Sequence, residues 1–129
     1  MIAGQETIGL ELLQARPDLG TLLVPLSGGG LAGGIAAAAT AIKPGIRVVS
    51  ITMDRGAAMH ASIRAGHKAK VEEVPSLADS LGGGIGMQNR LSFPQCRDLL
   101  DKAVLVTEAE IYRRLQAIYW EERMVAEGA

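Results

Sequence analysis

Residues 21–42 read TLLVPLSGGGLAGGIAAAATAI, a succession that predicts a strand, a glycine-rich turn and a helix. The apolar run Thr21–Pro25 has no polar alternation, which is typical of a strand covered on both faces of its sheet. Three glycines at 28–30 follow, and Leu31–Ile42 consists almost wholly of small and aliphatic residues. A buried strand that feeds a helix through a tight turn is the first half of a parallel α/β unit.

The same alternation continues on both sides of this stretch. We expect further strands at Arg47–Met53, Val71–Val74 and Ala103–Val106, and helices over Thr7–Gln14, Ala57–Ala65, Ser92 to about Leu100 and Thr107 to about Val125. Thr107 and Glu110 have the spacing of a capping box, and Ser92 with Gln95 resembles one. Together the segments predict a single α/β domain, with a parallel sheet, flanking helices and right-handed crossovers.

The glycine-rich turn is the first candidate site. Because Gly28, Gly29 and Gly30 have no β-carbons, their amides can turn toward one concave point, and the start of the following helix adds positive potential. These features predict a cradle for a phosphate group. A β-branched side chain at Gly29 is expected to fill this cradle, and Gly33 and Gly34 are expected to let the helix pack close to the sheet.

The glycine pattern leaves the identity of the phosphate open. Residues 28–33 also satisfy the G-x-G-x-x-G pattern, and Asp54 follows the next strand, near where a dinucleotide-binding fold places the acid that binds ribose. A nicotinamide-dinucleotide-binding domain is therefore the alternative interpretation.

Composition argues against several classes of partner. The net charge is −1 and aromatic residues make up 3%, so the chain lacks the basic patch and stacking platforms typical of nucleic-acid-binding proteins. The longest apolar run is shorter than the roughly 20 residues that cross a bilayer, and no signal peptide is recognisable, so we expect no membrane partner and a cytoplasmic location. Cys96 is the single cysteine, and we expect it to be half-buried and not a nucleophile.

Several segments resemble the threonine dehydratase and serine racemase family, which has fold type II of the pyridoxal-phosphate enzymes. The similarity begins with AGQETI at 3–8 and VPLSGGGL at 24–31, and continues through ADS at 78–80, VTEAEI at 106–111 and EGA at 127–129. It follows the family's order along essentially the whole chain, which favours this family over a dinucleotide-binding domain. Residues 52–60 and 80–86 look most like the dehydratase of hydroxyectoine utilisation.

The resemblance implies pyridoxal 5′-phosphate as the cofactor, a small hydroxy-amino acid as the substrate, release of ammonia as the reaction, and a homo-oligomer. It implies that the cofactor's phosphate is bound by the glycine loop, that is by Ser27, Gly28, Gly29, Gly30 and Leu31. It also implies that Ser80, where the family usually has glycine, lies close to the cofactor ring, and that Glu127 lies near the far side of that ring.

Other parts of the family's machinery are not matched. The family attaches its cofactor to a lysine in an upstream motif, which none of the four lysines here fits: Lys43, Lys68, Lys70 and Lys102. The residue that binds the pyridine nitrogen is expected downstream of Ala129. Thr52 and Ala58 stand where some relatives have metal-binding acids, so we expect no metal there.

These departures imply that residues 1–129 form part of the large, cofactor-binding domain of the tryptophan-synthase-β-like architecture. We expect this part to contain no catalytic residue and to be inactive alone. An inactive truncated remnant is the second alternative. Apolar surface left uncovered in such a part predicts a tendency to associate.

Overall fold

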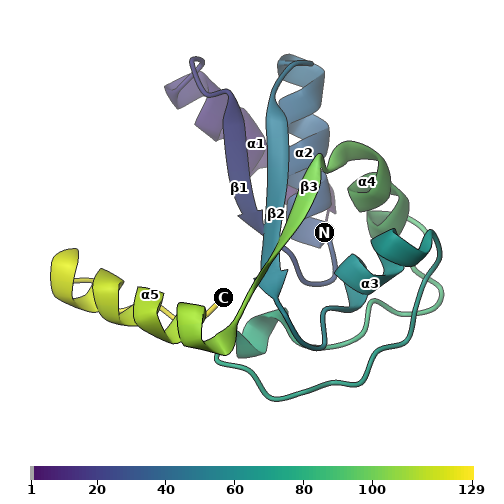
Figure 1. Ribbon diagram of the computed structural model, residues 1–129. Helices are drawn as coiled ribbons and strands as arrows, with labels where there is room; N and C mark the ends of the chain where they lie inside the picture. Colours follow the sequence, from purple (N-terminus) through teal and green to yellow (C-terminus); the bar gives the residue numbers. More distant parts are fainter. Residues whose placement is uncertain (1) are drawn as a thin grey trace.

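The computed structural model describes residues 2–129, which form a three-stranded sheet with helices around it (Figure 1). Neighbouring strands are parallel, in the order β1-β2-β3. The elements are α1 (Ile2–Ala15), β1 (Thr21–Pro25), α2 (Gly30–Ile42), β2 (Arg47–Met53), α3 (Ala58–Ala65), a 3₁₀ turn η1 (Asp79–Leu81), α4 (Ser92–Leu99), β3 (Lys102–Val106) and α5 (Glu108–Glu121). The predicted α/β class and parallel sheet are confirmed, as are the bounds of β1 and β2.

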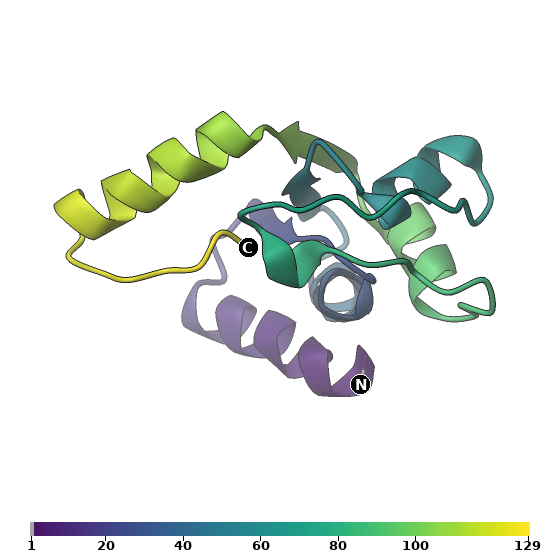
Figure 2. The same ribbon diagram turned by 90° about the horizontal axis from the view of Figure 1, so that it is seen from below.

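One face of the sheet carries most of the hydrophobic core. Leu22 and Val24 of β1 and Val48 of β2 pack there with residues of the helices, among them Ile35 of α2 and Phe93 of α4. Figure 2 shows α1, α2 and α4 on this side of the sheet and α5 on the other.

The opposite face of the sheet is only partly covered. Exposed and buried residues alternate along β1, and Leu23 keeps 67% of its surface exposed. In β3, no residue is fully buried, and Leu105 is exposed. The prediction that β1 is covered on both faces is wrong, because α1, α2 and α4 all lie against one face. A small cluster of Met53, Ala78 and Ile111 forms the only core beyond that layer among residues 2–129.

The loop after α3 and the ends of two helices differ from the prediction. Val71–Val74 is not a strand; its backbone lies instead against the turn at Gly56, where a β-carbon would come within 3.5 Å of the Val74 amide. Helix α1 begins at Ile2 and not Thr7, and α5 ends at Glu121, before the expected Val125. None of the helices within residues 2–129 is long and apolar enough to cross a membrane.

The two predicted capping boxes have different outcomes. At α5, the Thr107 hydroxyl accepts a hydrogen bond from the Glu110 amide at 3.3 Å, and the Thr107 amide donates to the Glu110 carboxylate at 2.8 Å, so this box is confirmed. The box at Ser92 is wrong. The N-cap of α4 is Leu91, which makes no side-chain hydrogen bond, and Ser92 is already the first helical residue. The Phe93 amide donates to the side-chain oxygen of Asn89 at 3.0 Å, and the Ser92 hydroxyl donates to the Gly28 oxygen.

The glycines inside α2 bring helices together, whereas we expected them to bring the helix close to the sheet. A β-carbon on Gly34 would lie 2.8 Å from the backbone oxygen of Ile2, and one on Gly33 would lie 3.3 Å from the side chain of Gln95 in α4. On Gly9 of α1, a β-carbon would likewise lie 3.0 Å from the Ile35 oxygen of α2. These small residues let α1 and α4 approach the α2 backbone, which explains why α1 extends back to Ile2.

Candidate functional site

The glycine loop lies at the carboxyl end of β1, where α/β sheets commonly bind ligands. The chain leaves the sheet after Leu26, whose amide still donates to the Ile51 oxygen of β2 at 2.8 Å. A cavity of about 200 Å³ opens beside the loop, and its walls are Pro25, Ser27, Gly28, Gly29, Gly30, Leu31, Ala32, Ser80 and Leu81. The structure therefore brings Ser80 to the same cavity as all five residues of the predicted phosphate loop.

Unpaired backbone amides give this cavity its chemistry. Gly29 is the N-cap of α2, and the first helical hydrogen bond runs from the Gly33 amide to the Gly29 oxygen at 2.9 Å. The amides of the residues in between have no partner inside the helix, because a helix begins with four such donors. Together with the positive end of a 13-residue helix, they suit a phosphate dianion. The residues present therefore fit the phosphate of the expected cofactor.

Gly29 itself is required for a reason that the sequence did not reveal. Its φ is +83°, in the left-handed region, and a β-carbon there would lie 2.7 Å from both Cys96 Sγ and Met59 Cε. These atoms belong to α4 and α3, beneath the loop. A side chain at this position would enter the core and not fill the cradle, so the expected reason for its effect is wrong.

Ser80 and Glu127 are hydrogen-bonded to each other, although 47 positions separate them in the chain. The Ser80 hydroxyl donates to the Glu127 carboxylate at 3.2 Å. Glu127 does not line the loop cavity; it borders a neighbouring cavity of about 420 Å³ beneath α5, and reaches the glycine loop only through Ser80.

The segment 76–81 that carries Ser80 is held at two points by α5 and its tail. At the start of α5, the Glu108 carboxylate accepts from the Ser76 hydroxyl at 2.5 Å and from the Leu77 amide at 2.9 Å. These hydrogen bonds, the Ser76 bond foremost, lower the pKa of Glu108 below its ordinary value. After α5, Gly128 passes so close to the Leu77 backbone that a β-carbon would collide with it.

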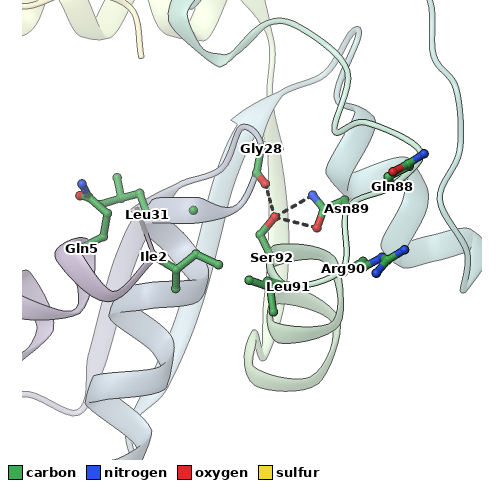
Figure 3. Close-up of a pocket in the computed structure, with 10 residues that line it drawn as sticks. Ile2, Gln5, Gly28, Leu31, Gln88, Asn89, Arg90, Leu91 and Ser92 are labelled. Carbon is green, nitrogen blue, oxygen red and sulfur yellow. Dashed lines mark hydrogen bonds between the residues drawn. The ribbon is translucent and has the colours of Figure 1, made fainter.

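A second, larger cavity of about 800 Å³ adjoins the glycine loop and was not foreseen from the sequence (Figure 3). It lies between the start of α1, the loop and the segment before α4, and its lining includes Gly28, Leu31, Asn89 and Ser92. The one sequence signal for its polar part is an asparagine just before a helix, a residue type preferred at helix caps.

Other candidate groups lie apart from the loop cavity. Asp54 pairs with its neighbour Arg55 at 3.3 Å and does not line the cavity, nor does any lysine. Cys96 is fully buried, deeper than expected, and burial raises the pKa of its thiol to about 11. Thr52 and Ala58 are buried, and no cluster of three or more potential metal ligands occurs in residues 2–129.

Comparisons with known proteins agree on one family. The family model described as "Pyridoxal-phosphate dependent enzyme" matches residues 1–129. A protein of Sinorhizobium fredii named "Putative threonine dehydratase" is 57% identical over the whole chain, which covers 39% of that relative, and L-threonine ammonia-lyase of Thermotoga maritima is 35% identical, with 32% of its length covered. The chain thus spans between about a third and two-fifths of these relatives.

Solved structures show the same similarity. Maize serine racemase superimposes with a TM-score of 0.91 at 34% identity, over 98% of this chain and 38% of the racemase. Threonine deaminase isoform 2 of Solanum lycopersicum superimposes with a TM-score of 0.90 at 30% identity, over 98% of this chain and 36% of the deaminase.

Proposed function

The chain belongs to the family of pyridoxal-phosphate dependent enzymes, and from that premise we propose that it forms the phosphate-binding part of an ammonia-lyase that acts on a hydroxy-amino acid. The names of its relatives support this reaction class, since they include threonine dehydratases and L-threonine ammonia-lyases. In the same proposal, residues 1–129 are part of a larger cofactor-binding domain.

The observation that carries the proposal is the cavity at the glycine loop, where unpaired amides at the start of α2 meet Ser80. The amides of residues 28–31 and the Ser27 hydroxyl would hold the cofactor's phosphate. When bound, the cofactor supplies an electron sink for the substrate's α-carbon. Ser80 would lie beside the cofactor ring, and Glu127 would present a carboxylate to the same region through its bond with Ser80.

The chain alone is proposed to bind the cofactor's phosphate without turning over substrate. None of the lysines lines either cavity at the glycine loop. Lys43 follows α2 and donates to the oxygens of Pro17 and Leu19, and Lys102 begins β3, so both lie at the edge of the sheet opposite the loop. Ammonia release from threonine or serine by the purified chain, supplied with pyridoxal phosphate, would contradict this point.

The finer identity of the substrate remains part of the proposal. Threonine and serine are the first candidates, and an amino acid derived from hydroxyectoine is the second, on the likeness of residues 52–60 and 80–86 to that dehydratase. A homo-oligomer is proposed as well, because Leu23 and Leu105 leave an apolar strand surface exposed.

Pyridoxine 5′-phosphate tests the cradle directly. It has an alcohol in place of the cofactor's aldehyde, so it cannot react with surface lysines. We expect it to bind the chain in calorimetric titration at least about tenfold more tightly than pyridoxine, which lacks the phosphate, because hydrogen bonds to a charged group stabilise a complex by about 1.5–3 kcal/mol each. Equal affinity for the two compounds would remove the phosphate-cradle assignment.

A further inference from the structure

We propose that Ser92, oriented by Asn89, is a positioning residue that sets which way the Gly28–Gly29 peptide faces, and thereby sets the phosphate affinity of the glycine loop. This inference rests on the proposed function of the loop, but it concerns α4, which contributes no backbone amide to the loop cavity. The hydrogen bonds that carry it are drawn in Figure 3.

The first step is the direction of the Ser92 hydroxyl. Its oxygen lies 2.7 Å from the Gly28 backbone oxygen and 2.7 Å from Asn89 Nδ2. The Asn89 Nδ2 group can only donate, so it occupies a lone pair of the hydroxyl. Two acceptors are then in reach of the single hydroxyl proton, the Gly28 oxygen at 2.7 Å and Asn89 Oδ1 at 3.1 Å. The Gly28 oxygen is the nearer one, and Asn89 Oδ1 already accepts from the Phe93 amide, so the proton is directed to the Gly28 oxygen. Asn89 is itself fixed, because its Nδ2 donates to the Ile85 oxygen at 3.1 Å and its Oδ1 accepts from the Phe93 amide at 3.0 Å.

The second step is the geometry of the peptide. All peptide bonds of residues 2–129 are trans, so the Gly29 N–H points opposite to the Gly28 C=O. Ser92 holds that C=O toward α4, and the Gly29 N–H therefore points away from α4. The next carbonyl is also turned from the cavity, because the Gly29 oxygen accepts from the Gly33 amide at 2.9 Å and contacts Cys96 Sγ at 3.5 Å.

The third step is that the loop does not hold this orientation by itself. The peptide has glycine on both sides, and glycine adopts positive and negative φ with little penalty. A flip of this peptide would replace an N–H donor by a carbonyl oxygen, which repels a phosphate. The bond from Ser92, which is only 8% exposed, is the side-chain contact that favours one orientation over the other.

The test compares Ser92→Ala with a matched control, Ser62→Ala. Ser62 is also a buried helical serine, and its hydroxyl donates to the Ala58 oxygen at 2.7 Å, but it touches neither cavity at the loop. For each variant, the affinity for pyridoxine 5′-phosphate is measured by titration, the stability by urea unfolding, and the direction of the Gly29 N–H in the unliganded chain by its residual dipolar coupling.

We expect Ser92→Ala to weaken phosphate binding by about tenfold, the effect of one lost hydrogen bond of ordinary strength, and to change the Gly29 coupling. Ser62→Ala should lose a comparable amount of stability and change neither quantity. Unchanged affinity and coupling in folded Ser92→Ala would overturn the inference, and so would equal losses of affinity in both variants. If the wild-type chain does not bind the probe, the proposed function fails, while the coupling still decides whether Ser92 orients the peptide.

Discussion

Replacing Gly29 with alanine should destabilise the whole fold, although the residue lies in a loop. Two costs combine. The left-handed backbone at φ +83° penalises a residue with a β-carbon by about 1–2 kcal/mol. The new methyl would also lie 2.7 Å from Cys96 Sγ and Met59 Cε, and overpacking of this kind costs about 1–3 kcal/mol.

A smaller effect opposes these costs, since alanine restricts the unfolded chain more than glycine and so favours folding by about 0.4–1 kcal/mol. The net loss is about 1–5 kcal/mol, a substantial part of the roughly 5–15 kcal/mol by which single domains are stable. At the denaturant sensitivity of a chain this size, it corresponds to a fall of about 1–3 M in the midpoint of urea unfolding.

Gly28→Ala is the matched control for this measurement. Gly28 has no positive φ, and no atom lies within 4 Å of the β-carbon it would gain. The free energy of unfolding of Gly28→Ala should therefore stay within about 0.5 kcal/mol of the wild type. Circular dichroism during urea titration reports both variants. A Gly29→Ala chain that unfolds at the wild-type midpoint would refute the argument that this position is fixed by the core beneath it.

Three further predictions concern other parts of the molecule. Because hydrogen bonds lower the pKa of Glu108 in the folded chain, its carboxylate contributes stability above the ordinary pKa of 4.5, and that contribution is lost as the pH falls through the folded value. The free energies of unfolding of Glu108→Gln and wild type, measured by urea titration, should therefore differ most near pH 7 and converge in acid. The thiol of Cys96, with its pKa raised to about 11, should react with iodoacetamide at pH 8 only as fast as the chain unfolds, and rapid labelling of the native chain would contradict its burial. Leu23→Asp should reduce self-association in sedimentation experiments, because the residue is 67% exposed on the open sheet face, and an unchanged association constant would exclude this face as the contact.

Local patterns predicted most of the fold. The apolar runs Thr21–Pro25 and Arg47–Met53 predicted β1 and β2 with the bounds that the structure shows. The glycine loop between β1 and α2 lies at the predicted edge of the sheet. Val71–Val74 misled the prediction because its two valines are typical of strands, whereas the segment has no neighbouring strand and packs against a turn. Burial of β1 was overestimated, because a run of apolar residues does not say whether both faces of a sheet find a partner.

The candidate site was predictable where one segment carries it and not where several meet. Residues 27–31 follow one another, so their common cavity could be expected from the glycine pattern. The contact of Ser92 with the Gly28 oxygen joins residues 64 positions apart, and a serine at the first position of a helix gives no sign of such a partner. The same holds for the bond between Ser80 and Glu127, which only the fold brings together.

The contacts of α5 and its tail with the 76–81 segment make the conformational order of that segment depend on the order of residues 127–129. Glu108 at the start of α5 hydrogen-bonds to this segment, and Glu127 and Gly128 after α5 contact it as well. Neither the segment nor the tail can therefore become disordered without breaking contacts of the other. A ligand that immobilises Ser80 should therefore slow hydrogen exchange at residues 127–129, and loss of the Glu127 carboxylate should weaken binding at the glycine loop.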